Sequence, residues 1–162
     1  MGAEEFSTYK VPGPLRLVDF GKLASEPGHE HLKVESWAPS YPAGVDPNMT
    51  MFENIAGGDI LIHNPFESYE PVVKFVEEAA ADPDVLAIKQ VLYRTARNSR
   101  FITALCRAAE GGKQVTVLVE LKARFDESHN LDQAERLQRA GVQVVYGVKG
   151  FKTHAKDTLV VR

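Results

Sequence analysis

Residues 85–120, "VLAIKQVLYRTARNSRFITALCRAAEGGKQVTVLVE", predict a β-α-β unit. Valine, isoleucine and leucine dominate residues 85–94 and 114–121, as is typical of buried strands. Ser99 is a residue type that caps helices, and Gly111-Gly112 is a typical helix end. Four apolar residues lie between them at helical spacing: Ile102, Leu105, Cys106 and Ala109. A strand, a helix and a second strand in this order indicate the α/β fold class.

The segments on both sides of this unit continue the alternation of strands and helices. "DILIH" at residues 59–63 and "VQVVYG" at residues 142–147 predict further strands. Residues 68–82, with Pro71 in the first turn, and residues 131–140 predict helices. Three successive β-α-β crossovers therefore predict a mixed, mostly parallel sheet flanked by helices.

The last apolar run, "THAKDTLVV" at residues 153–161, predicts a strand that completes the sheet. Too few residues separate it from the strand at 142–147 for the crossover of about a dozen residues that a parallel return needs. We therefore expect the last strand to run antiparallel to its predecessor. A move to the other edge of the sheet remains open as an alternative.

The first part of the chain lacks this periodicity. Residues 1–48 hold most of the nine prolines, and so long an irregular stretch is uncommon inside a compact domain. Residues 1–58 are therefore interpreted as a linker or arm, with one short helix within residues 49–59 that ends at Gly57-Gly58. Residues 59–162 are expected to form the α/β domain.

The composition excludes several classes of protein. The chain has 162 residues and a net charge of −3, so it has no basic excess for binding nucleic acid. No apolar run reaches the length of a transmembrane helix, and residues 1–10 do not resemble a signal peptide. Cys106 is the single cysteine and is expected to be a buried apolar residue. A chain that cannot form an internal disulfide suits a reducing compartment, the cytoplasm.

Four side chains with suitable chemistry are expected at one edge of the sheet. His154 and Lys156 are two residues apart in the last predicted strand, so they should share a face. Arg94 ends one predicted strand and Arg124 follows another. An antiparallel last strand begins at the carboxyl edge of the parallel strands, where open α/β sheets bind their ligands. We therefore predict that the four side chains converge there.

Such a cluster is suited to phosphoryl chemistry. Guanidinium and ammonium groups bind phosphate oxygens, and a neutral imidazole can attack phosphorus to form a covalent phosphohistidine. The flanking cations would stabilise the charge on the phosphoryl oxygens during transfer. A structural histidine and surface ion pairs are the alternative interpretations of these four residues. Asp126 and Glu127 are weak candidates for binding a divalent cation, since they could equally cap the following helix.

Four blocks of the sequence carry a resemblance to a known family. They are "DILIHNPFESYEPVV", "DPDVLAIKQVLYRTARNS", "GKQVTVLVELKARFDE" and "AGVQVVYGVKGFKTHAK". In this order they closely resemble bacterial polyphosphate kinase of the large type, which is related to phospholipase D. The segment "YKVPGPLRLVDFGKL" resembles the part that leads into that family's catalytic region, so the resemblance spans nearly the whole chain. It implies a phospholipase D-like fold in an enzyme of the cytoplasm or of the periphery of the inner membrane.

The resemblance also implies an activity, which is the reversible transfer of the terminal phosphate of ATP to polyphosphate through a phosphohistidine. His154 matches the phosphorylated histidine, and Lys156 is interpreted as a clamp on phosphate. Arg94 and Arg124 match arginines assigned to magnesium and phosphate binding. Because magnesium takes oxygen ligands, these arginines are interpreted as holding the phosphates that hold the metal. The implied cofactor is Mg2+, the implied substrates are ATP or ADP and inorganic polyphosphate, and the parent enzyme is expected to be a homo-oligomer.

Departures from the family pattern shape this prediction. Family members are several times longer and have a second catalytic half, so residues 59–162 match a truncated first half that alone is expected to be inactive or nearly so. Asp157 stands where an apolar residue is expected, facing away from His154 and towards either the helices or solvent. One alternative is a homodimeric phospholipase D-type phosphodiesterase or nuclease, which the missing acid at Val161 disfavours. The other is a non-catalytic interaction module.

Overall fold

The structure, a computed structural model, describes residues 10–13, 15–93, 96, 99–120, 127–147 and 150–162. The chain divides into two units, Met1–Ala38 and Pro39–Arg162. This division falls earlier than the boundary after residue 58 that the sequence pattern suggests. Residues 39–58 and the short helix near their end therefore belong to the unit that contains the sheet.

The described residues of the first unit form the short 3-10 helices η2 (Leu17–Gly21), η3 (Leu23–Ser25) and η4 (Glu30–Leu32). Each described residue of this unit is exposed. Several of the exposed side chains are large and apolar, among them Leu17 and Phe20. The described part of this unit thus has no core of its own, and its interpretation as a linker or arm stays a prediction.

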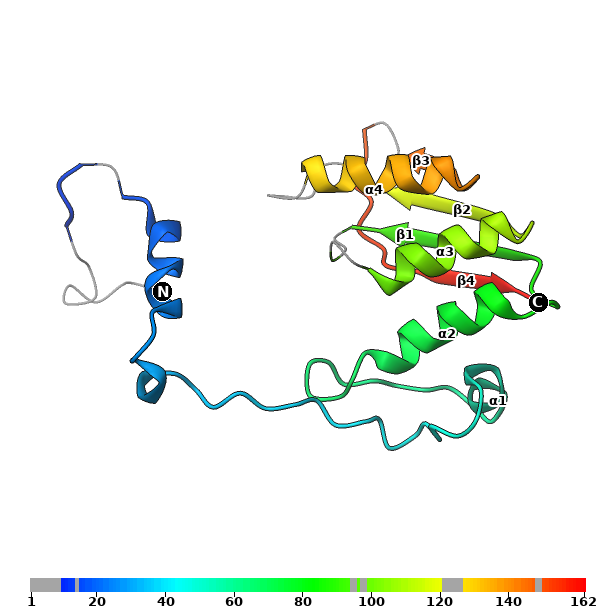
Figure 1. Cartoon of the computed structure of the whole chain (residues 1–162), viewed down its shortest axis with the longest axis horizontal. Coiled ribbons are helices and arrows are strands. Elements are labelled where there is room, and N and C mark those ends of the chain that lie inside the picture. Colours follow the sequence, from blue (N-terminus) through cyan, green and yellow to red (C-terminus); the bar gives the residue numbers. More distant parts are fainter. Residues whose placement is uncertain (1–9, 14, 94–95, 97–98, 121–126, 148–149) are drawn as a thin grey trace. The chain divides into compact units, whose positions relative to one another are not determined.

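The second unit is built on a four-stranded mixed sheet (Figure 1). Its strands are β1 (Ala87–Leu92), β2 (Gln114–Val119), β3 (Gln143–Tyr146) and β4 (Thr158–Val161), in the order β3-β2-β1-β4. Strands β1, β2 and β3 are parallel, and β4 pairs antiparallel with β1. The expected direction of the last strand is confirmed. Strand β4 pairs with β1 and not with β3, the strand that precedes it in the chain. The last strand therefore lies at the other edge of the sheet, which was the alternative left open.

The strand predicted at residues 59–63 is wrong. These residues have no regular secondary structure, and Leu61 is 92% exposed. A strand needs a partner for its backbone hydrogen bonds, and the sheet in the described part of the chain ends at β3 and β4. Two β-α-β crossovers, and not three, therefore build the sheet.

Helices α1 (Met51–Ala56), α2 (Glu70–Ala81), α3 (Arg100–Glu110) and α4 (Glu127–Arg139) complete the unit. The predicted caps are confirmed where they were expected. The Ser99 side chain accepts a hydrogen bond from the Ile102 amide at the start of α3, and Pro71 lies in the first turn of α2. Figure 1 shows α3 and α4 crossing the same face of the sheet, as two right-handed crossovers in one direction require.

The core lies between these helices and one face of the sheet. Strand residues alternate between the faces, so Ile88 and Val117 are fully buried, whereas Lys89 is exposed. Leu105 of α3 and Leu137 of α4 are also fully buried. Cys106 is 7% exposed, which confirms its prediction as a buried residue. No helix within the described residues is long and apolar enough to span a membrane.

Candidate functional site

His154 and Lys156 do not lie in a strand, which corrects the prediction from the sequence. Strand β4 begins only at Thr158, and the preceding residues are irregular because ladder pairing with β1 starts at Gln90–Thr158. Strand alternation therefore does not set the direction of the two side chains. The Lys156 Nζ instead donates a hydrogen bond to the His154 carbonyl oxygen at 2.5 Å.

The expected edge of the sheet is nevertheless correct for both residues. Because β4 runs antiparallel to β1, the segment that precedes β4 lies beside the carboxyl end of β1. The Val91 amide donates to the Asp157 carbonyl oxygen at 2.9 Å, which fixes this position. The His154 and Lys156 side chains are exposed there. An exposed imidazole at the carboxyl edge is accessible to a phosphorylated ligand.

Tyr93, the residue that follows β1, brings two ammonium groups to this edge. The Lys156 Nζ lies 4.8 Å from the centre of the Tyr93 ring, and the Lys152 Nζ lies 5.9 Å from it. Cations at these distances are attracted by the negative face of an aromatic ring. Sequence reasoning missed Tyr93 and Lys152. The signal was a further lysine two residues before His154.

Arg94 and Arg124 lie outside the described residues, so their convergence with His154 stays a prediction. Asp126 also lies outside them. The described residues next in sequence are Tyr93, which is at the carboxyl edge, and Glu120, which directly follows β2.

Two buried polar side chains lie at this edge, of which the sequence suggested Glu120 only as a surface ion-pair partner for the arginines and did not suggest Asn130. Glu120 is 7% exposed and Asn130 is 4% exposed. The Asn130 Nδ2 donates to the Tyr93 carbonyl oxygen at 2.8 Å and to the Glu120 carbonyl oxygen at 3.2 Å. The Glu120 Oε2 accepts a hydrogen bond from the Thr153 amide at 2.9 Å. A glutamate at the end of an otherwise apolar strand was the available signal for such a network.

The start of β4 is held by a third buried polar residue, Gln90. Its Nε2 donates to the Asp157 carbonyl oxygen at 3.2 Å, and its Oε1 accepts from the Thr158 Oγ1 at 2.6 Å. The Asp157 side chain is exposed, so of the two environments expected for its carboxylate, solvent is the correct one. No apolar residue is required at this position because only the Asp157 backbone takes part in the sheet.

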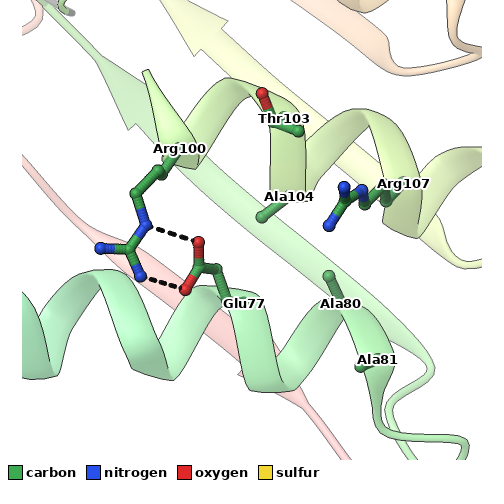
Figure 2. A pocket seen from close by; sticks show the side chains of 7 residues that line it. All are labelled: Glu77, Ala80, Ala81, Arg100, Thr103, Ala104 and Arg107. Carbon is green, nitrogen blue, oxygen red and sulfur yellow. Dashed lines mark hydrogen bonds and ion pairs between the residues drawn. The ribbon is translucent and has the colours of Figure 1, made fainter. Parts of the chain in front are cut away.

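A groove of about 940 Å³ lies beside these residues, and a second hollow of about 470 Å³ lies between α2 and α3. Tyr93, Lys156 and Thr158 line the first. The second is shown in Figure 2, where the Arg100 guanidinium faces the Glu77 carboxylate. Arg100 donates to Glu77 at 2.8 and 2.5 Å and to Glu70 at 2.7 and 2.8 Å.

These hydrogen bonds stabilise the charged forms of both Arg100 and Glu77 in the second hollow. The hydrogen bonds that Arg100 donates to Glu77, and then those to Glu70, raise the pKa of Arg100, and the same bonds to Glu77 hold the pKa of Glu77 below its ordinary value. The charge of Arg100 is thus used to join α2 to α3. Lys156 lines the groove next to Tyr93 and not this hollow, whereas His154 is among the lining residues of neither. The groove is therefore the better candidate for a ligand.

Magnesium would need a set of oxygen ligands. Within the described ranges, no group of three or more histidine, cysteine, aspartate or glutamate side chains could hold a metal ion. The Glu120 carboxylate accepts a backbone hydrogen bond instead. The described residues therefore do not fit a dedicated magnesium site.

Comparison with known proteins assigns this chain to a family. The family model for polyphosphate kinase C-terminal domain 1 matches residues 50–162, and the chain belongs to this family. The crystal structure of polyphosphate kinase from Porphyromonas gingivalis superposes with a TM-score of 0.73 at 40% identity, over 88% of this chain and 22% of that one. The second unit thus has the phospholipase D-like α/β fold that was expected.

Two curated relatives show the same similarity in sequence. Polyphosphate kinase from Rhodopirellula baltica is 50% identical over 154 residues, which are 95% of this chain and 18% of that protein. Polyphosphate kinase from Halalkalibacterium halodurans is 51% identical over 156 residues, which are 95% of this chain and 22% of that protein. The chain therefore spans about a fifth of the length of these relatives.

Proposed function

We propose that this chain carries the phosphate-accepting histidine of an ATP–polyphosphate phosphotransferase, with His154 as the nucleophile. One observation supports this proposal most strongly. In a chain of the polyphosphate kinase family, an exposed imidazole lies at the carboxyl edge of the sheet, in the same segment as two lysines gathered by Tyr93.

The proposed reaction has two steps. In the first, an unprotonated ring nitrogen of His154 attacks the terminal phosphorus of ATP. A nitrogen–phosphorus bond forms, the bond from that phosphorus to the bridging oxygen breaks, and ADP leaves with the electron pair. In the second, a terminal oxygen of polyphosphate attacks the phosphohistidine, and the nitrogen–phosphorus bond breaks. The chain of phosphates grows by one, and the reverse sequence regenerates ATP.

The cations act on the charge of the phosphates. Lys156 and Lys152 carry ammonium groups that can neutralise phosphoryl oxygens as the transition state forms. Arg94 and Arg124 are proposed to bind two oxygens each, as planar guanidinium groups do. Magnesium is proposed to bind through the phosphate oxygens of the substrate. The steps above depend only on the histidine and on these cations.

The test is to measure transfer of phosphate to His154. Because relatives are about five times longer than this chain, we expect the isolated chain to incorporate little label from γ-labelled ATP. A chimera in which this chain replaces the matching segment of the Halalkalibacterium halodurans enzyme should form an acid-labile, alkali-stable phosphohistidine and extend polyphosphate.

Histidine variants of the chimera identify the acceptor. His154→Gln should abolish labelling and polyphosphate synthesis, whereas His29→Gln, which changes an exposed histidine of the first unit, should retain both. Label that persists in the His154→Gln chimera, or that maps to another residue of this chain, would contradict the proposal.

A further inference from the structure

A buried hydrogen-bond network joins three segments of the chain directly beneath the proposed phosphohistidine. Asn130 of α4 donates both amide hydrogens to backbone carbonyl oxygens, that of Tyr93 at 2.8 Å and that of Glu120 at 3.2 Å. The Glu120 carboxylate in turn accepts the hydrogen of the Thr153 amide at 2.9 Å. These contacts connect the ends of β1 and β2 to the segment that precedes β4.

Each joined segment leads into a residue of the proposed reaction. Tyr93 precedes Arg94, Thr153 precedes His154, and Glu120 lies four residues before Arg124 in the printed sequence. The network uses backbone atoms of all three segments, together with the side chains of Asn130 and Glu120. The network therefore fixes the position of the backbone at this edge and not that of the reacting groups themselves.

We propose that Asn130 and Glu120 are positioning residues, which hold the backbone at the carboxyl edge in the arrangement that phosphoryl transfer from ATP to His154 requires. This inference rests on the proposed function. Misplacing a reacting group by about 1 Å can slow a reaction about 100-fold. A nucleophile on an irregular segment, outside the ladder of β4, depends on such contacts more than one within a strand.

The chemistry of the two side chains makes the proposal specific. The amide at position 130 donates to two carbonyl oxygens at once, whereas an ionised carboxylate of similar size has no hydrogen to donate and would face the same oxygens with negative charge. Position 120 needs an acceptor for the Thr153 amide, which the oxygen of a glutamine amide can supply. Asn130→Asp should therefore break the network, while Glu120→Gln should keep the Thr153 contact and Glu120→Ala should lose it.

The experiment compares these variants in the chimera described above, with Thr116→Val as a matched control. The Thr116 Oγ1 donates to the Gln143 Oε1 at 3.2 Å, so this control removes a polar contact between β2 and β3 away from the proposed site. Rates of phosphohistidine formation are corrected for the folded fraction and measured over a range of ATP concentrations.

We expect Asn130→Asp and Glu120→Ala to lower the maximal rate about 10- to 100-fold, with a much smaller change in the ATP concentration for half-maximal rate. Glu120→Gln and Thr116→Val should stay within about threefold of the parent rate. In the 162-residue chain, Glu120→Ala should speed hydrogen exchange of the Thr153 amide, because the bond that protects it is gone.

The outcomes separate this inference from the proposed function. Parent rates in folded Asn130→Asp and Glu120→Ala chimeras, or an equal loss in Thr116→Val, would overturn the positioning role. If Asn130→Asp does not fold, the difference between Glu120→Gln and Glu120→Ala decides. A parent chimera that forms no phosphohistidine overturns the proposed function itself, and Thr153 exchange then still shows whether the network holds the segment.

Discussion

The contact between Gln90 and Thr158 should anchor the start of β4, and its strength can be predicted from the structure. The Thr158 hydroxyl donates to the Gln90 Oε1 at 2.6 Å, and Gln90 is 8% exposed. A neutral hydrogen bond contributes about 0.5–1.5 kcal/mol net, and leaving a buried partner unsatisfied costs about 1–3 kcal/mol. Thr158→Val keeps the shape and removes the hydroxyl, so it should lower the free energy of unfolding by about 1–2 kcal/mol.

Gln90→Leu should cost more than Thr158→Val. It also removes the hydrogen bonds from the Gln90 Nε2 to the Asp157 carbonyl oxygen at 3.2 Å and to the Val91 carbonyl oxygen at 2.9 Å. In the double variant Gln90→Leu/Thr158→Val both polar groups are removed together, so neither is left buried without its hydrogen-bond partner. The combined cost should therefore be smaller than the sum of the two single costs by about 1 kcal/mol.

Urea unfolding of the parent chain, the two single variants and the double variant measures this coupling energy. Hydrogen exchange shows which part of β4 is loosened. The Val91 amide, which donates to the Asp157 carbonyl oxygen, should exchange faster in both single variants. The Leu86 amide donates to the Val161 carbonyl oxygen at the other end of β4 and provides the internal control. A coupling below about 0.3 kcal/mol, or equal acceleration at Val91 and Leu86, would refute the local anchoring of β4.

Three further predictions concern α2, α3 and α4. The hydrogen bond from Arg100 holds the pKa of Glu77 below its ordinary 4.5. The stabilisation that the ionised Glu77 gives the fold is therefore present above pH 4.5 and is lost as the pH falls through the lowered pKa. Glu77→Gln should make the free energy of unfolding less dependent on pH in this acid range, and an unchanged pH profile would contradict this cause. Burial raises the pKa of the Cys106 thiol, so at pH 8 it should react with a thiol reagent much more slowly in the native chain than in urea; equal rates would show that it is accessible. Leu137→Ala should lower the free energy of unfolding by about 2–5 kcal/mol, since Leu137 is fully buried; denaturant unfolding checks this against Gln138→Ala, an exposed neighbour that should change it by less than about 0.5 kcal/mol.

The helices and the parallel strands were predictable because their signals are local. The Ser99 cap, Pro71 in the first turn of α2 and the apolar spacing of α3 each act within a few residues of chain. A buried parallel strand also has a recognisable composition, as in β1 and β2. These elements need no distant partner to be identified from sequence, although they need one to be stable.

The errors in the predicted strands concern pairing between distant segments. Residues 59–63 have the composition of a strand, but they have no ladder partner among the described residues. Residues 153–157 have an apolar and polar alternation, yet pairing with β1 starts only at Thr158. Composition does not state which edge is free or how far a ladder extends, because both depend on where other strands lie.

The amino-acid sequence alone determined which side chains lie close together in the chain: a histidine and lysines in one segment, after a run of strands and helices that places the segment at a carboxyl edge. The tertiary structure alone decided which backbone groups that edge brings together, through Glu120 and Asn130. The reason is physical. Side-chain type and spacing are properties of the chain, whereas a buried carboxylate or amide takes its partner from whichever segment folding places within hydrogen-bond distance.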